Sequence, residues 1–190
     1  MDIPRKGNLD VRNLKWIYSS VLFLVLAVLS AVLLSGSWSG LFTRPGFLGT
    51  RAQIYPDINL TAQFLLLLGL SLGVFFARTG HITAHQYTQT SMVLLNLVLA
   101  FSIMVQSFLR SVVPGLPGNL TTLTGLISTT HAVIGSLAIL CGIYLLLRMN
   151  KILPRNLRIA WWESLMRLTF ALYWIAGILG FLLYYAWYVR

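Results

Sequence analysis

The chain has 190 residues, of which 57% are hydrophobic and only 9% charged, and its mean hydropathy is +0.79. A soluble domain carries about 25% charged residues, so this chain has too few charges to cover a surface that faces water. Its outer surface must therefore face lipid. We expect an integral membrane protein whose first partner is the lipid bilayer.

The net charge of +10 would suggest nucleic-acid binding in a soluble protein. Here no basic groove with interleaved aromatic residues is visible, and membrane topology explains the excess of Lys and Arg, so no nucleic acid is expected. Cys141 is the single cysteine and lies in a hydrophobic run, which excludes a disulfide framework and a CxxC site.

In chain order, a basic tail at residues 1–15 precedes five apolar stretches. Each stretch is near the roughly 20 residues that a helix needs to cross a bilayer. We predict an all-α integral membrane protein, a five-helix transmembrane bundle over residues 16–190. Its predicted spans are 16–34, 60–77, 87–109, 128–147 and 168–189. The first stretch is too long for the core of a signal peptide and is predicted to remain a membrane helix.

The distribution of Lys and Arg predicts the orientation of these spans. With the N-terminus inside, ten basic residues fall on the inner side and four on the outer side. The outer residues are Arg44, Arg51, Arg110 and Arg190. Because basic residues concentrate on cytoplasmic loops, we expect an inner N-terminus and an outer C-terminus.

Two histidines, His81 and His85, lie four residues apart before the predicted third span. If this segment is helical, they share a face and could hold a metal ion together. The alternative for His81, which we favour, is an exposed position in a short inner loop. His85, at the mouth of the span, remains a candidate ligand.

A polar stripe continues from His85 along the predicted third span. Polar side chains are costly against lipid, so this stripe should face the interior of the bundle. There it would either form hydrogen bonds between helices, which we favour, or line an interior that takes a cofactor. The stripe comprises Gln89, Met92, Asn96, Gln106 and Ser107.

A second stripe, on the predicted fourth span, begins at His131 and continues through Gly135, Ala138 and Gly142. Small residues allow another helix, or a flat macrocycle such as haem b, to approach closely. We favour helix packing, which also explains Gly69 and Gly73. The alternative makes His131, Gly135 and Gly142 cofactor-binding residues, together with His85 and Met92.

The predicted depths of His85 and His131 argue against one iron held by both. His85 lies at the inner end of the third span, whereas His131 lies roughly 25 Å from the inner boundary, by the helical rise per residue. Two ligands of one iron need the same depth. Two cofactors with one histidine each, or ligation by histidine and methionine with Met104 or Met149, therefore stay open.

The sequence contains no recognisable catalytic motif. No nucleophile elbow, Gly-rich phosphate loop or carboxylate pair is visible, and none of the four acidic residues lies inside a predicted span. We expect no independent catalytic activity.

Several short motifs are spread over residues 56–185: Pro56-Asp57-Ile58-Asn59, Ala77-Arg78-Thr79-Gly80-His81-Ile82-Thr83-Ala84-His85, Ser91-Met92, Arg167-Leu168-Thr169-Phe170, Tyr173-Trp174-Ile175 and Gly177. With these motifs the chain resembles a bacterial membrane-protein family that is often encoded near haem-copper oxidase genes. The family pattern carries four histidines at the membrane edges, two near each face; His85 and His131 match one of each pair. The other two positions fall near Trp162 and Ser111, so each pair has lost a member.

The resemblance and the missing catalytic residues together favour an accessory or assembly subunit of a membrane electron-transport complex, respiratory or photosynthetic. Its partners would be other membrane subunits, and its location the bacterial plasma membrane. The first alternative is a b-type cytochrome-like protein with haem on His85, His131 or both. The second is a small transporter, which would need broken helices or an intramembrane charge.

Overall fold

The computed structural model describes residues 44–190, and these residues form an all-helical unit. Its four long helices are α3 (Ile54–Arg78), α4 (Ile82–Leu99), α6 (Leu123–Met149) and α7 (Trp162–Tyr184). The shorter elements are η1 (Ala100–Met104), α5 (Val105–Ser111), η2 (Val113–Gly115), η3 (Gly118–Thr121), η4 (Arg155–Leu157) and η5 (Tyr185–Val189).

Four helical runs are long and apolar enough to cross a membrane: Ile54–Arg78, Ile82–Gly115, Leu123–Met149 and Trp162–Val189. The predicted spans 60–77, 87–109, 128–147 and 168–189 each lie inside one of these runs. The predicted first span, 16–34, and the basic tail, 1–15, lie outside the described residues. The count of five helices therefore remains a prediction.

The helices extend beyond the predicted spans because hydropathy marks only the part that lies in hydrocarbon. Helix α3 begins at Ile54 and α7 at Trp162, so Asp57 and Glu163 lie in the first turns of these helices. Both residues precede the predicted spans 60–77 and 168–189, in helical turns that hydropathy did not predict. An acidic side chain is favourable there, because the N-terminus of a helix carries partial positive charge.

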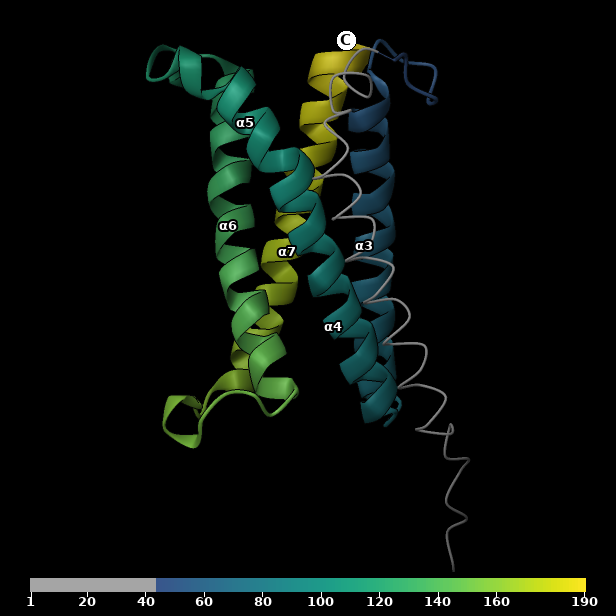
Figure 1. Cartoon of the computed structure of the whole chain (residues 1–190), viewed down its shortest axis with the longest axis vertical. Helices are drawn as coiled ribbons and strands as arrows, with labels where there is room; N and C mark the ends of the chain where they lie inside the picture. Colours follow the sequence, from purple (N-terminus) through teal and green to yellow (C-terminus); the bar gives the residue numbers. More distant parts are fainter. Residues whose placement is uncertain (1–43) are drawn as a thin grey trace, which may run out of the picture.

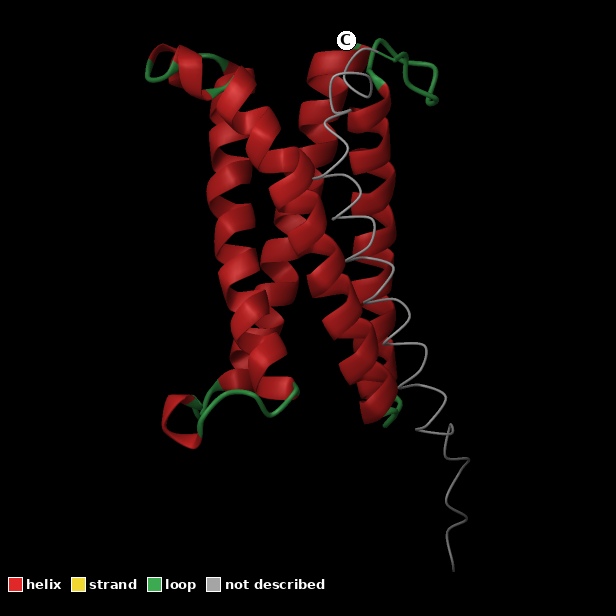
Figure 2. Cartoon of the chain, viewed as in Figure 1, coloured by secondary structure: helices red, strands yellow, loops and turns green. Residues whose placement is uncertain are grey.

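The four helices form two antiparallel hairpins, α3–α4 and α6–α7, which contact each other through α3 with α7 and α4 with α6 (Figure 1). The run from α4 through η1 to α5 slants across the bundle in this view. Short loops join the helices at both ends (Figure 2). Neighbouring helices thus run in opposite directions, as expected when short connections join them.

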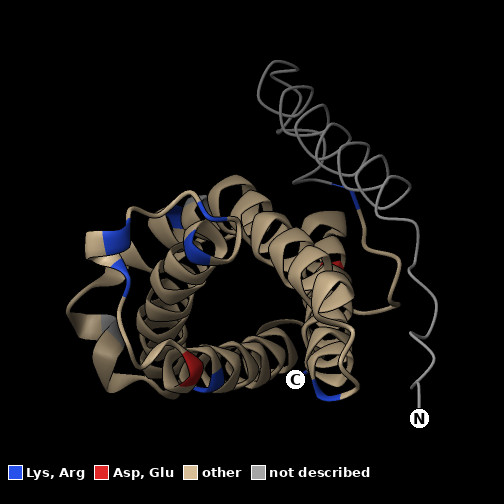
Figure 3. Ribbon diagram, turned by 90° about the horizontal axis from the view of Figure 1, so that it is seen from below, with Lys and Arg blue, Asp and Glu red and all other residues tan. Residues whose placement is uncertain are grey.

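The two ends of the bundle differ in charge. We call the end with residues 78–82 and 149–162 the lower end, and the end with residues 44–54, 111–123 and 184–190 the upper end. Seen from below, most of the Lys and Arg positions gather on one side, at the end of α6 and the loop that leads to α7 (Figure 3). The basic residues at or near the lower end are Arg78, Arg148, Lys151, Arg155, Arg158 and Arg167; those at the upper end are Arg44, Arg51, Arg110 and Arg190.

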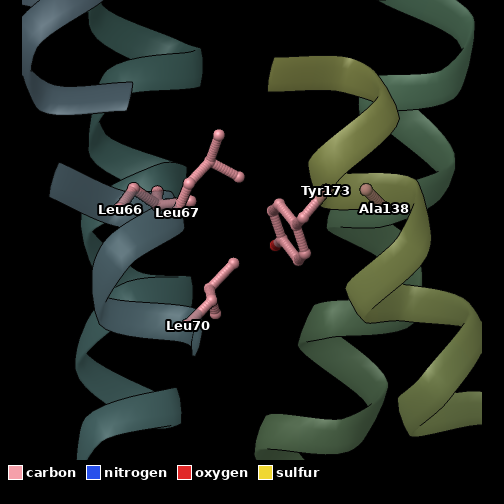
Figure 4. Close-up of a cluster of buried hydrophobic side chains, with 5 residues drawn as sticks. All are labelled: Leu66, Leu67, Leu70, Ala138 and Tyr173. Atoms are coloured by element: carbon pink, nitrogen blue, oxygen red, sulfur yellow. The ribbon is translucent and has the colours of Figure 1, made fainter. Parts of the chain in front are cut away.

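A small cluster of buried side chains joins the two hairpins. Leu66, Leu67 and Leu70 of α3 face Tyr173 of α7, with Ala138 of α6 behind it (Figure 4). The outer faces remain apolar, since large hydrophobic side chains all around the bundle stay exposed. This pattern suits a bundle whose solvent is lipid, where packing rather than hydrophobic burial holds the helices together.

Glycines allow the helices to approach closely. A Cβ atom at Gly69 would lie 2.3 Å from Sδ of Met92, and one at Gly73 would lie 2.6 Å from Nε2 of Gln89. The Gly69–Gly73 pair therefore receives two side chains of α4, as close helix packing requires. Gly177 of α7 accommodates Leu67 of α3 in the same way, with 2.5 Å from its would-be Cβ to Cδ1 of Leu67.

Candidate functional site: a cavity at the lower end

A cavity of about 760 Å³ lies between all four long helices at the lower end of the bundle. This volume is typical of sites that hold cofactors and other small molecules, about 300–1,000 Å³. Most of the wall is apolar, from side chains that include Leu70, Val74, Val93, Leu145, Leu146 and Phe170. The polar and sulfur-bearing side chains at the wall are Arg78, His85, Gln89, Thr90, Met149, Glu163, Met166, Arg167, Thr169 and Tyr173.

His85 enters this cavity from the first turn of α4. Its Nδ1 lies 2.8 Å from the carbonyl oxygen of Gly73 on α3. Since a carbonyl oxygen only accepts, Nδ1 must carry the hydrogen, and the neutral ring then keeps its lone pair on Nε2. Histidine ligands of metals are commonly held in the same way, by a hydrogen bond from the ring nitrogen that does not coordinate.

The floor of the cavity, which is its end farthest from the lower end of the bundle, is polar. The Tyr173 hydroxyl reaches across from α7 and accepts a hydrogen bond, 3.4 Å long, from the amide nitrogen of buried Asn96. Gly142 of α6 leaves room for that hydroxyl, which would lie 2.7 Å from a Cβ there. Closer to the lower end, Nε2 of Gln89 donates to the carbonyl oxygen of Leu70. Gln89 and Asn96 of the predicted polar stripe thus form hydrogen bonds between helices.

Hydrogen bonds tie α4 to the end of α6 beside the mouth of the cavity. Nε2 of Gln86 donates to the carbonyl oxygen of Met149, and Nδ2 of Asn150 donates to Oγ1 of buried Thr90. These bonds fix the Met149 backbone at the cavity rim. They also hold the turn that follows α6 against α4.

The loop between α6 and α7 is fastened by side chains of α6. The Tyr144 hydroxyl donates to the carbonyl oxygen of Leu157 and accepts from the backbone nitrogen of Ile159. Nη1 of Arg148 donates to the carbonyl oxygen of Ile159, and its guanidinium lies over the Trp162 ring, 5.0 Å from the centroid. Trp162, which lines the cavity, is therefore held in place by a cation–π contact.

His131 lies at the other end of the bundle, in a separate and smaller pocket of about 100 Å³. Its Nδ1 is 2.9 Å from the carbonyl oxygen of Ala176 on α7, and Gly180 leaves space beside the ring. His85 and His131 therefore share the same kind of anchoring but line different pockets. The structure does not place them around one iron, in agreement with the depth argument.

A buried carboxylate lies in a hydrogen-bond network at the upper end. Asp57 is fully buried and accepts hydrogen bonds from the backbone nitrogen of Leu48, at 2.7 Å, and from the Tyr184 hydroxyl, at 2.5 Å. The Tyr184 hydroxyl also lies 2.7 Å from Oγ1 of Thr50. This network fastens residues 46–52 over the first turn of α3 and joins that turn to the end of α7.

The remaining predicted site residues lie elsewhere. His81 is the exposed residue before α4; its Nδ1 bonds to Oγ1 of Thr79, 3.0 Å away, and it does not line the cavity with His85. Met92 packs on Gly69. A Cβ at Gly135 would meet nothing within 4 Å, so no described atom packs closely there. The stripe from His131 to Gly142 does not surround one cavity, because its two ends line different pockets.

No protein-family model matches the chain, and the comparisons with curated proteins and with solved structures found no match. The family resemblance of its short motifs therefore remains a prediction, and the site must be interpreted from its own geometry. Among residues 44–190, no three His, Cys, Asp or Glu side chains gather as a metal site would require.

Sequence reasoning missed several residues that shape the site. Arg78 and Arg167 were included in the count of basic residues and in the family motifs but were given no binding role, yet both line the mouth of the cavity. Tyr173 carried the signal of a hydroxyl inside a predicted span. Asp57 could have been singled out because it is one of four acidic residues in the whole chain and lies close to a predicted span.

Proposed function

We propose that this protein is an accessory subunit of a membrane electron-transport complex that holds a b-type haem in its lower cavity. The observation that supports this proposal is the position of His85, which lines a cavity of cofactor size and whose Nδ1 is taken by the carbonyl oxygen of Gly73, so that Nε2 is the ring nitrogen left for a ligand. Imidazole is a common axial ligand of haem iron. The haem would supply one-electron transfer, and the protein would supply the ligand, the apolar walls and the position in the membrane.

The residues around the cavity fit a flat amphipathic macrocycle. From Trp162 at the mouth to Tyr173 at the floor, the cavity follows about 16 Å of α7, at 1.5 Å per residue. Its walls are mainly aliphatic, and Phe170 and Trp162 add aromatic faces. Two thioethers, Met149 and Met166, also line it and are soft enough to serve as a second axial ligand.

His131 does not offer an equivalent haem site in this proposal. Its pocket, at about 100 Å³, is much smaller than the lower cavity of about 760 Å³ and too small for a porphyrin. The transporter alternative has less support, because the four described helical runs are irregular only at the π-helical turns η1 and η5 and at the terminal 3₁₀ turn η2, and none is unwound at its middle.

The proposal includes the topology predicted from the sequence: five spans, an inner N-terminus and the bacterial plasma membrane. In the part of the chain that the structure describes, six basic residues lie at or near the lower end and four at the upper end. The positive-inside rule therefore favours a lower end that faces the cytoplasm. The haem would then lie close to the inner face, where other membrane subunits could exchange electrons with it.

A visible absorption spectrum tests the proposal. The full chain, purified in mild detergent from membranes and supplied with haem, should show a Soret band that titrates to one haem per chain. His85→Ala should lose this band, whereas His131→Ala, which removes an equally anchored histidine at the opposite end, should keep it. Absence of a Soret band from the folded wild-type chain, or equal bands in the two variants, would contradict a haem site at His85.

A further inference from the structure

We infer that Arg78 and Arg167 bind the two propionate groups of the haem and so fix its orientation, with the carboxylates at the mouth of the cavity and the vinyl-bearing edge toward Tyr173. This inference rests on the proposed haem site and assigns a recognition role to two residues. The ligand class is an amphipathic macrocycle with carboxylates on one edge.

The two arginines are placed for this role by neighbouring helices. Arg78 is the last residue of α3, and Arg167 lies in the second turn of α7, a helix that contacts α3. Both line the cavity where it reaches the lower end. Guanidinium groups offer several donors in a planar fork that matches a carboxylate, so each is suited to one propionate.

Neither guanidinium is committed elsewhere within residues 44–190, where no hydrogen bond or ion pair holds it. Arg148, by contrast, is already engaged by Ile159 and Trp162. The arginines at the mouth are therefore the cationic groups that remain available to an anion in the cavity. Both residues are exposed, so their long side chains can follow a ligand as it enters.

Glu163 is the one acidic side chain at the cavity wall among the described residues. It lies one turn before Arg167 on the same face of α7, so its carboxylate would repel a propionate that binds there. This gives the inference a prediction of opposite sign: removing the charge of Glu163 should strengthen binding of a carboxylate-bearing ligand.

The test compares haem with haem dimethyl ester, in which both propionates are esterified and uncharged. Arg78→Gln and Arg167→Gln should each weaken haem binding about three- to tenfold, as expected for a partly screened charge-assisted contact. Binding of the dimethyl ester should not change. Arg155→Gln removes the same charge from the same end without touching the cavity, so it should bind both ligands as the wild type does. Glu163→Gln should bind haem more tightly and the ester unchanged.

The outcomes separate the two proposals. If the wild type shows a His85-dependent Soret band but the arginine variants bind haem as tightly as Arg155→Gln does, the haem site stands and the propionate assignment is overturned. The assignment is also overturned, with the haem site intact, if haem and its ester lose affinity equally in the arginine variants. If the wild type binds neither ligand, both the haem site and the assignment are overturned.

Discussion

Nδ1 of His85 on α4 lies 2.8 Å from the carbonyl oxygen of Gly73 on α3. This bond joins the two helices of one hairpin and also occupies one of the two ring nitrogens. Because Nδ1 holds the hydrogen, Nε2 of the neutral ring is the atom available to a ligand. The same contact therefore carries both a structural and a chemical role.

These two roles can be separated by chemical rescue. In His85→Gly the Soret band of added haem should disappear, and imidazole in the buffer should restore it by entering the space of the lost side chain. A purely structural role would leave the band unresponsive to imidazole, because a free ligand cannot rejoin two helices. The measurement is the Soret absorbance as imidazole is titrated, with His131→Gly as the control.

Two glycines of α6 should respond differently to the same substitution. Gly142→Ala places a Cβ 2.7 Å from the Tyr173 hydroxyl, a rigid group that also bonds to Asn96. We expect this variant to lose about 1–3 kcal/mol of unfolding free energy through overpacking. Gly135→Ala meets open space and should gain up to about 1 kcal/mol from helix propensity. Denaturation in mixed micelles measures both, and equal effects at the two positions would contradict this packing.

Tyr184→Phe should destabilise the upper end. The substitution removes the hydroxyl that donates to the fully buried Asp57 carboxylate. Loss of a hydrogen bond to a charged group costs about 1.5–3 kcal/mol. Tyr185→Phe, at an exposed neighbouring position, supplies the matched control and should be nearly neutral. Hydrogen exchange at Leu48, whose amide donates to Asp57, should rise in the first variant alone.

The orientation of the bundle can be tested with single cysteines. In a Cys141→Ser background, Arg155→Cys at the lower end should be protected from a membrane-impermeant thiol reagent in intact cells. Leu120→Cys, which is exposed at the upper end, should react. Both should react after permeabilisation. The reverse pattern in intact cells would place the lower end outside and reject the proposed topology.

The positions of four spans could be predicted from the sequence because lipid selects for long apolar runs, and length at a fixed rise per residue decides whether a run can cross. The helix ends were harder to predict. Hydropathy says nothing about the polar turns that continue a helix into the headgroups, and so the helical placement of Asp57 and Glu163 was missed.

Composition and spacing alone determined that this is a helical membrane protein, because a chain with 9% charged residues cannot cover itself in water. They also indicated that His85 and His131 lie at different depths. Only the tertiary structure decided that Arg78, Arg167 and Tyr173, from two different helices, line one cavity with His85. Which side chains meet depends on helix rotation and slant, and these are set by contacts such as Gln89 on Gly73, between residues that no local pattern connects.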